Sequence, residues 1–249
     1  MTTPLDRPAT ADGLFLWIIH RFAEVFEDHA ILKGGMALRL IDSPRATTDI
    51  DYVFVPYASK KYISRQIESV LREIEDARVE VELHSRMLRG EIRLDGAAIQ
   101  LEVNVALECD GIPMSTGGFA RRLGQPARVI RIMSPDWAFA HKLAAWNERR
   151  LIRDLYDCYF FVARLNVRPA EDVLDRRLGD VASRIPALVR RHTMTRADLG
   201  GELRREAAEL TQERMVAELG GVLPNEEIAG LAPRVKAATV KTAEWLEEH

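Results

Sequence analysis

Apolar and polar residues alternate through residues 78–107, and this alternation constrains the fold more than any other feature of the sequence. The segments VEVELH, EIRLD and IQLEVNVAL carry it, with turns expected near Arg89-Gly90 and near Asp95-Gly96. A period of two places successive side chains on opposite faces, which is typical of half-buried strands. The segment therefore predicts three antiparallel strands that share one buried face.

The residues around this segment mix helix and strand patterns up to residue 133. Apolar spacing and turn residues predict helices over 14–27, 36–41 and 58–76 and a strand over 49–55. Residues 30–32 form a short apolar segment, and residues 128–133 are expected to form a last strand or an extended connection. Residues 111–126 are rich in glycine and proline and predict a loop.

The pattern changes at Ser134-Pro135-Asp136, which has the features of a helix start: a serine cap, a proline in the first position and an acid in the first turn. Only helical patterns follow. Breaks are expected near Arg168-Pro169, Gly179, Pro186, Gly200-Gly201 and Pro224. We therefore expect an α+β chain with an α/β core over residues 1–133 and a helical region over 134–249.

The overall charge limits the possible partners. The 249 residues include 35 basic and 38 acidic side chains, which gives a net charge of −3. A chain that binds nucleic acid through its overall charge would be basic, so any such contact must come from a local patch. A DNA-binding regulator is a poor fit, because no basic recognition helix with a helix-turn-helix pattern is evident.

The cysteine count and the N-terminus bear on location. Cys109 and Cys158 are too few for a disulfide framework, and they suit buried thiols in a reducing compartment. The first twelve residues contain no apolar run typical of a signal peptide, and no stretch of 18 apolar residues occurs. We expect a cytoplasmic protein without membrane contact.

The segment Asp49-Ile50-Asp51 opens the strand expected over 49–55. Residues i and i+2 of a strand point to the same face, so both carboxylates project together. Two such charges about 5 Å apart repel by roughly 3 kcal/mol at an effective dielectric constant near 20. A bound cation would relieve this repulsion, and carboxylate oxygens favour Mg²⁺ or Mn²⁺. The alternative is that one aspartate caps a turn and the other is solvated.

Lys33-Gly34-Gly35 precedes the helix expected over 36–41. Backbone N–H groups at such a glycine pair can approach phosphate oxygens closely, since no Cβ is in the way, and a helix N-terminus is partly positive. An ordinary tight turn is the alternative. The sequence contains neither a P-loop motif nor the glycine fingerprint of a Rossmann site.

Glu102 is a candidate third acid. In IQLEVNVAL the apolar residues point one way, and Gln100, Glu102 and Asn104 point the other. A strand that brings Glu102 beside the aspartate pair would supply a further metal ligand or a general base. The alternative is a solvent-facing glutamate on an edge strand.

The helical region has a second charged cluster. Lys142 and Arg149 are two turns apart, and Arg150, Asp154 and Asp157 have the spacing of one stripe if a single helix continues through them. Charges among apolar neighbours are costly to bury unless they are paired or used in function. Intrahelical salt bridges such as Arg150–Asp154 are the alternative explanation.

Taken together, these segments resemble the AbiEii/AbiGii-type nucleotidyltransferase toxins, which include the MenT toxins. The resemblance covers about residues 30–165 and rests on the order and spacing of four strings: Leu32-Lys33-Gly34-Gly35-Met36-Ala37-Leu38, Arg45-x-Thr47-x-Asp49-Ile50-Asp51, Lys142-Leu143-x-Ala145, and Arg153-Asp154-Leu155-Tyr156-Asp157. It implies a DNA polymerase β-like nucleotidyltransferase core with a mixed or antiparallel sheet, followed by a helical half that completes the active site.

The resemblance also implies roles for individual residues. Mg²⁺ (or Mn²⁺) would be held by Asp49 and Asp51, with Glu102 as the further candidate ligand. The candidate nucleotide-binding residues are Lys33, Gly34, Gly35, Arg39, Lys142, Arg149 and Arg153, and the candidate catalytic residues are Asp49, Asp51, Lys142, Asp154 and Asp157. This chain departs from many polymerase β-like enzymes in having Gly34-Gly35 instead of Gly-Ser, and Glu102 instead of a third aspartate.

The function implied is transfer of a nucleotide from an NTP to an acceptor within a toxin–antitoxin or phage-defence system. Some family members add nucleotides to the 3′ end of tRNA, so tRNA is the expected acceptor. A cognate antitoxin is the expected protein partner. Two alternatives stay open. In the first, the chain transfers a nucleotide to a protein or a small molecule instead of tRNA. In the second, the chain is an inactive relative that binds a nucleotide and acts through protein contacts.

Overall fold

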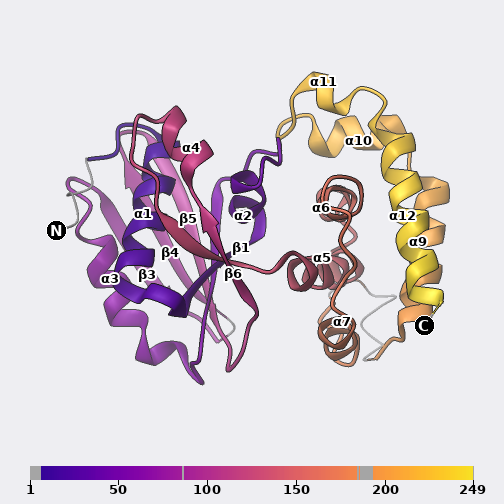
Figure 1. The fold of residues 1–249 in the computed structure, drawn as a ribbon, viewed down its shortest axis with the longest axis horizontal. Helices are drawn as coiled ribbons and strands as arrows, with labels where there is room; N and C mark the ends of the chain where they lie inside the picture. The colour runs from indigo at the N-terminus through magenta and orange to yellow at the C-terminus, as the bar shows by residue number, and fades with distance from the viewer. Residues whose placement is uncertain (1–6, 86, 184, 186–192, 249) are drawn as a thin grey trace. The chain divides into compact units, whose positions relative to one another are not determined.

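The computed structural model describes residues 7–85, 87–183, 185 and 193–248. The chain divides into two compact units, Met1–Ser134 and Pro135–His249. Figure 1 shows strands and helices in the first unit and helices in the second. In the described part of the chain, none of the helices combines the length and the apolar character that a membrane crossing needs.

The first unit begins with a long helix and then alternates between strands and short helices. Its elements are α1 (Ala11–Phe26), η1 (Glu27–His29), β1 (Ala30–Lys33), α2 (Gly34–Leu40), β2 (Asp49–Phe54), η2 (Lys60–Tyr62), α3 (Ser64–Leu71), β3 (Arg78–Leu83), β4 (Leu88–Leu94), β5 (Ala97–Val105), β6 (Gly111–Ser115), α4 (Gly117–Arg122) and β7 (Val129–Met133). The helix expected over 58–76 is shorter, because α3 ends at Leu71.

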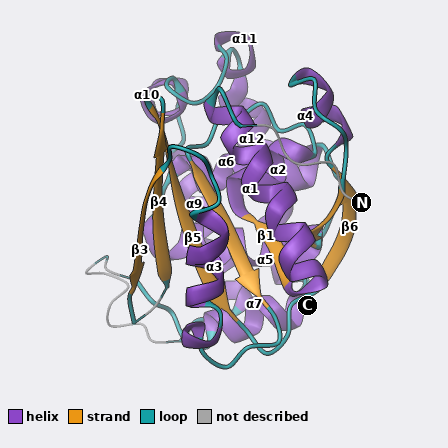
Figure 2. Ribbon diagram, turned by 90° about the vertical axis from the view of Figure 1, so that its left-hand side faces the viewer, coloured by secondary structure: helices purple, strands orange, loops and turns teal. Residues whose placement is uncertain are grey.

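The strands form one seven-stranded sheet in the order β3-β4-β5-β2-β1-β7-β6 (Figure 2). β2 runs parallel to β5 and β1 runs parallel to β7, whereas the other neighbouring pairs are antiparallel. The mixed sheet with its helices confirms the predicted α+β class. The antiparallel meander of β3, β4 and β5 confirms the prediction from the alternating segment.

One face of the sheet is apolar and packs against helices. Leu101 and Val103 of β5 and Ile50 of β2 are fully buried there, in the same core as Ile18 and Phe22 of α1. The helix α1 begins where the Thr10 hydroxyl accepts a hydrogen bond from the Gly13 N–H at 3.0 Å. Because side chains alternate along each strand, the polar residues between these apolar ones lie on the opposite face.

Two local predictions in the first unit are wrong. The turn expected near Arg89-Gly90 is wrong, because β3 ends at Leu83, β4 begins at Leu88, and Gly90 lies inside β4 opposite Leu101. An added Cβ at Gly90 would make ordinary van der Waals contacts, 3.4 Å from the Leu101 Cβ and 3.6 Å from the Leu71 Cδ1, so this glycine marks no turn. Residues 111–126 are no simple loop, because they form β6 and α4; an edge strand tolerates the missing N–H of Pro113.

The described residues of the second unit form helices. These are α5 (Pro135–Arg149), α6 (Ile152–Ala163), α7 (Glu171–Leu178), α9 (Arg196–Glu209), α10 (Gln212–Leu219), α11 (Asn225–Ile228) and α12 (Leu231–Glu247). The break expected at Gly200-Gly201 is wrong, because α9 continues through both glycines; Gly200 is buried there, close to Glu247 of α12. Pro186 lies outside the described residues.

The helix expected to continue through Arg150 is interrupted. Arg150 has a φ of 56°, and the chain turns there between α5 and α6. The stripe predicted for Arg150, Asp154 and Asp157 is therefore wrong, because Arg150 precedes the helix that carries the two acids. Lys142 lies on α5, which packs against α6.

Candidate functional site

A row of charged side chains crosses the polar face of the sheet. Lys33 at the end of β1 lies opposite Asp51 of β2. On its other side Asp51 lies opposite Glu102 of β5, which in turn lies opposite Arg89 of β4. Residues in register on neighbouring strands point to the same face. The register therefore gives two adjacent acids with one cation on each outer side.

Asp51 is held between a cation and a glycine. Its Oδ1 lies 3.8 Å from the Lys33 Nζ, and both side chains are about one quarter exposed. Its Oδ2 occupies the space next to Gly34, where an added Cβ would lie only 2.1 Å away. Gly34 also has a φ of +72°, which disfavours any other residue. Gly34 therefore gives the Asp51 carboxylate its position at the start of α2.

Thr47 fixes the strand entrance from which Asp49 projects. The Asp49 N–H donates to the Thr47 hydroxyl at 3.2 Å, and this hydroxyl donates to the Asp49 carbonyl at 3.2 Å. An added Cβ at Gly35 would lie 3.0 Å from both Thr47 Oγ1 and Arg45 Nη2. From the sequence, Arg45 and Thr47 had no predicted role in the site. Their position at alternate residues just ahead of Asp49 and Asp51 was the feature that could have indicated one.

Asp51 of this row and Asp49, two residues earlier on β2, are the acids best suited to a cation. Asp49 is exposed, and one of its oxygens accepts a hydrogen bond from the Thr48 hydroxyl at 3.3 Å. Their i, i+2 spacing in β2 directs both carboxylates to the polar face. Two carboxylates with one distant lysine make a donor set that fits a hard divalent cation.

Glu102 lies beside this pair but has partners of its own. Its Oε1 accepts from Arg89 Nη2 at 3.2 Å and from Gln100 Nε2 at 3.0 Å. The side chain is about one quarter exposed, on a strand inside the sheet. Within the described ranges, no group of three or more His, Cys, Asp or Glu side chains is arranged to hold a metal ion. A role for Glu102 as third ligand stays a prediction.

Arg39, a predicted nucleotide-binding residue, makes its contacts with the helices on the apolar side of the sheet. Its guanidinium donates two hydrogen bonds to the Asp12 carboxylate, at 3.0 and 3.1 Å. It also lies 5.2 Å from the ring centroid of Phe119 in α4. These contacts give Arg39 a structural role, and its binding role stays a prediction.

The second unit has its own acid pair, Asp154 and Asp157 of α6, and both side chains are buried. The Lys142 Nζ lies 2.7 Å from Asp157 Oδ2 and 3.6 Å from Asp154 Oδ1. Arg149 donates to both oxygens of Asp154, at 2.7 and 3.1 Å. Burial raises the pKa of the neighbouring Cys158 thiol, and the two acids raise it further.

The remaining arginines of this region lie apart from the acid pair. Arg150 donates to the Asn147 carbonyl and side chain, each at 3.0 Å, and to Glu202 at 2.9 Å. Its guanidinium also lies 4.6 Å from the Trp146 ring centroid. Arg153 is exposed on the first turn of α6. The expected salt bridge between Arg150 and Asp154 is replaced by these contacts, since the helix break turns Arg150 toward α9.

Comparisons with known proteins identify the family of this arrangement. A family model described as nucleotidyl transferase AbiEii toxin, type IV TA system, matches residues 18–240. Among solved structures, MenT4, a nucleotidyltransferase toxin from Mycobacterium tuberculosis, matches with a TM-score of 0.60 and 17% identity over 96% of this chain and 83% of that chain. JHP933 from Helicobacter pylori matches with a TM-score of 0.54 and 15% identity over 96% and 92%. At these identities the structures establish the fold, and none of the curated proteins matches the sequence.

Proposed function

The chain belongs to the AbiEii family of nucleotidyl transferase toxins, and from this premise we propose that Asp49 and Asp51 form the centre at which it transfers a nucleotide to tRNA. Family membership makes the chain a nucleotidyltransferase toxin. The observation that carries the placement is the Asp51 carboxylate, which packs against Gly34 and shares the polar sheet face with Asp49. The tRNA acceptor, the metal ion and the roles of individual residues are the parts that we propose.

Asp49 and Asp51 would hold Mg²⁺ or Mn²⁺, which when bound neutralises charge on the triphosphate. The two carboxylates are available because Lys33, at 3.8 Å from Asp51, balances only part of their charge. Gly34 and Gly35 leave backbone N–H groups accessible to phosphate oxygens, and Lys33 adds a positive charge beside them. These residues bind and orient the NTP.

In the transfer, a 3′ hydroxyl oxygen of the acceptor tRNA bonds to the α-phosphorus of the NTP. The bond between this phosphorus and the bridging oxygen of the β-phosphate breaks, and pyrophosphate leaves. The hydroxyl proton passes to a carboxylate or to solvent, and Glu102 is the candidate acceptor on this face. Its hydrogen bonds from Arg89 and Gln100 hold this carboxylate in place on the face.

The roles expected for the second unit stay proposals. Lys142 would contact the triphosphate, with Arg149 and the exposed Arg153 holding phosphates, while Asp154 or Asp157 would be a further acid of the catalytic site. A structural role explains four of these five residues as well, because Lys142 and Arg149 pair with the two buried acids. Measurements of stability and activity on the same variants separate the two roles.

We also propose a cytoplasmic setting with an antitoxin as partner. The type IV toxin–antitoxin description of the family supports the partner. Cys109 and Cys158 are free thiols, and burial raises the pKa of Cys109 to about 12, which keeps this thiol protonated and unreactive. Two such thiols suit a reducing compartment.

The decisive experiment incubates the full chain with each α-labelled NTP, Mg²⁺ and total tRNA. We expect label on tRNA with at least one NTP, no transfer after chelation with EDTA, and none to tRNA whose 3′ end is blocked by periodate oxidation. Transfer of the label to a protein or to a small molecule would show that this molecule, not tRNA, is the acceptor. Absence of both NTP binding and transfer would overturn the proposal in favour of a relative that acts through protein contacts.

A further inference from the structure

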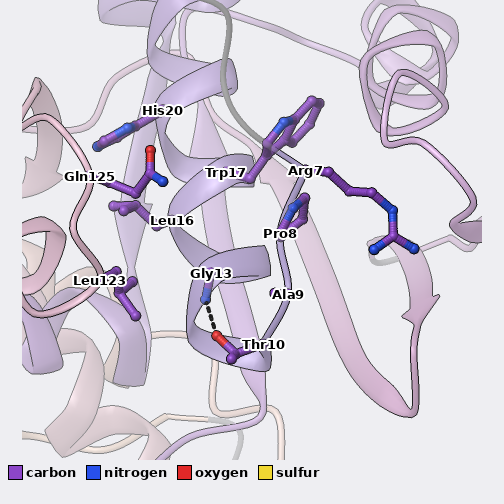
Figure 3. Close-up of a pocket in the computed structure, with 10 residues that line it drawn as sticks. All are labelled: Arg7, Pro8, Ala9, Thr10, Gly13, Leu16, Trp17, His20, Leu123 and Gln125. Atoms are coloured by element: carbon purple, nitrogen blue, oxygen red, sulfur yellow. Dashed lines mark hydrogen bonds between the residues drawn. The ribbon is translucent and has the colours of Figure 1, made fainter.

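A small cavity opens beside the N-terminal half of α1 (Figure 3), but it is too small for a nucleic-acid ligand. Its volume is about 200 Å³, below the roughly 300–1,000 Å³ of most ligand pockets, and its walls include the apolar side chains of Leu16, Trp17 and Leu123. A contact with RNA beyond the reacting 3′ end therefore needs open, positively charged surface.

Residues 57–65, here called the basic segment, supply such surface. They contain Lys60, Lys61 and Arg65, and no aspartate or glutamate occurs anywhere in 52–67. Lys61 and Arg65 are exposed, and among the described residues no acid forms an ion pair with either side chain. Several other arginines of this unit are paired with acids: Arg21, Arg72, Arg78, Arg89 and Arg93. In a chain with a net charge of −3, the basic segment is thus a local source of positive potential.

An exposed aromatic ring lies within the basic segment. Tyr62 is 74% exposed, whereas the next residue, Ile63, is 1% exposed and belongs to the apolar core. Because most of its surface is open, the Tyr62 ring can receive a stacked base. Cations that contact phosphates, beside an aromatic ring that stacks a base, are the means by which proteins bind single strands.

The turn that carries Tyr62 is held in place by contacts on both sides. The Ser59 hydroxyl accepts from the Lys61 N–H at 3.4 Å, and the Tyr62 N–H donates to the Ser59 carbonyl at 3.3 Å. Lys60 Nζ donates to the Ser85 carbonyl at 2.9 Å, which joins the turn to the residues after β3. Together with the buried Ile63, these contacts preorganise the segment, so binding requires little further ordering of its backbone.

The basic segment follows the end of the sheet at which β2 and β5 finish. Phe54 pairs with Val105 there, and the Tyr57 N–H donates to the Ala106 carbonyl at 2.9 Å. Asp51 lies three residues before Phe54 in β2, which is about 10 Å along the strand. A single RNA strand of a few nucleotides can extend from one place to the other.

We propose that the basic segment binds the single-stranded 3′ segment of the acceptor RNA, a few nucleotides before its reacting end. One base stacks on the Tyr62 ring, and Lys61 and Arg65 contact neighbouring phosphates. This assignment rests on the proposed transfer to tRNA at Asp49 and Asp51, and it adds the surface that holds the strand.

The test measures binding of a fluorescein-labelled single-stranded RNA of about twelve nucleotides, within the usual site sizes of about 4–16, to the full chain by fluorescence anisotropy. NTP and Mg²⁺ are absent, so the result does not depend on transfer. Tyr62→Ala should weaken binding at least about fivefold, the lower end of what one stacked base contributes. Tyr62→Phe keeps the ring and should bind within about twofold of the wild type.

The salt dependence of binding tests the two cations. Each phosphate contact on a single strand contributes about 0.7 to the slope of log K against log salt, so Lys61→Ala combined with Arg65→Ala should lower this slope by about 1.4. Arg72→Ala is the matched control, because the exposed Arg72 directly follows α3 and pairs with Glu68 at 2.7 Å. It should leave both the slope and the affinity unchanged within about twofold. Circular dichroism checks that each variant is folded.

Three outcomes would overturn the inference: no RNA binding by the wild type, unchanged binding in Tyr62→Ala and in the double variant, or equal weakening by the double variant and Arg72→Ala. If the wild type nevertheless transfers label to tRNA, only the assignment of the basic segment is wrong. If RNA binding depends on Tyr62, Lys61 and Arg65 as expected but no transfer occurs, the basic segment is supported and the proposed transfer centre is wrong.

Discussion

The two acid pairs of this chain, Asp49–Asp51 and Asp154–Asp157, contain the same side chains in opposite electrostatic settings. Asp51 is 22% exposed with one lysine at 3.8 Å, and Asp49 is exposed. The side chains of Asp154 and Asp157 are 2% and 0% exposed, and each has a cation at 2.7 Å. The first pair retains charge for an external cation, whereas the second is neutralised by protein groups.

This difference follows from the cost of removing charge from water. A buried carboxylate is stable only when nearby cations and hydrogen bonds replace its hydration. Lys142 and Arg149 fulfil this requirement for the acids of α6. The pair on β2 keeps contact with water, since Asp49 is exposed and Asp51 is 22% exposed, so it needs less compensation. Loss of one member of the buried pair should therefore affect stability, and loss of one member of the exposed pair should affect activity.

The largest effect is expected for Asp157→Ala. Without this carboxylate, the mostly buried Lys142 ammonium keeps only one of its two acids, Asp154, at 3.6 Å. Breaking one side of a buried pair costs about 3–5 kcal/mol in the free energy of unfolding. Urea denaturation followed by circular dichroism measures this loss.

The matched control for Asp157 is Asp172→Ala on α7, where an exposed aspartate pairs with Arg176. Exposed pairs of this kind contribute less than about 1 kcal/mol. If Asp157→Ala proves as stable as Asp172→Ala but inactive, the second acid pair is catalytic and the comparison drawn above is wrong.

The next effect is on activity, in Asp51→Asn. The exchange keeps the size of the side chain but removes the charge that would hold the cation. We expect transfer to fall at least about 100-fold, equivalent to about 2.7 kcal/mol of barrier height. The free energy of unfolding should change by less than about 1 kcal/mol, because the ion pair with Lys33 is partly exposed.

Glu80→Gln is the control for charge on the same face. The register links Glu80 through β4 and β5 to Asp49, and Glu80 is exposed on the edge strand β3. Its loss should leave transfer within about twofold of the wild type, an effect of less than about 0.5 kcal/mol. Equal losses in Asp51→Asn and Glu80→Gln would show that general charge, not a specific site, supports the reaction.

A smaller effect on stability is expected for Gly34→Ala. A side chain at φ +72° costs about 1–2 kcal/mol. The new Cβ would also lie 2.1 Å from Asp51 Oδ2 and must displace the carboxylate. Transfer should therefore fall by more than the loss of stability explains. Activity and unfolding are measured on the same preparation.

Gly118→Ala is the matched exchange, since Gly118 lies in α4 with open space around its added Cβ. Alanine favours the helix by up to about 1 kcal/mol over glycine, so this variant should be slightly stabilised and fully active. A Gly34→Ala protein that behaves in the same way would disprove the proposed link between Gly34 and Asp51.

The placement of Asp49 and Asp51 on one face of a strand could be predicted from the sequence, because it depends only on neighbouring residues. Alternation assigns Asp49 and Asp51 to one face, and the same rule orients Glu102. The register that brings Glu102 opposite Asp51 is a contact between segments about 50 residues apart, and no local pattern encodes it. The pairing of Glu102 with Arg89 depends on the same long-range register.

The helix break at Arg150 was missed for a related reason. A positive φ is unusual for arginine, and its neighbours contain no glycine or proline to signal it. Contacts with Asn147, Glu202 and Trp146 stabilise the turn, and Glu202 belongs to a helix distant in sequence. A rule based on helical periodicity therefore joins α5 to α6, whereas tertiary contacts separate them.

The smallest changes in the free energy of unfolding are expected for two cations, Arg149 beside Asp154 and Lys33 beside Asp51. The Arg149 side chain is 48% exposed, so its two bonds to Asp154 are partly screened, and Arg149→Met should cost no more than about 1 kcal/mol. Lys33→Met should cost less than about 0.5 kcal/mol, because the 3.8 Å pair with Asp51 is longer and both partners contact water. Urea denaturation of both variants at two salt concentrations measures the difference. If Arg149→Met costs as much as Asp157→Ala, Arg149 shares equally with Lys142 in neutralising the buried acids, and the protection of that pair depends on a solvent-exposed group.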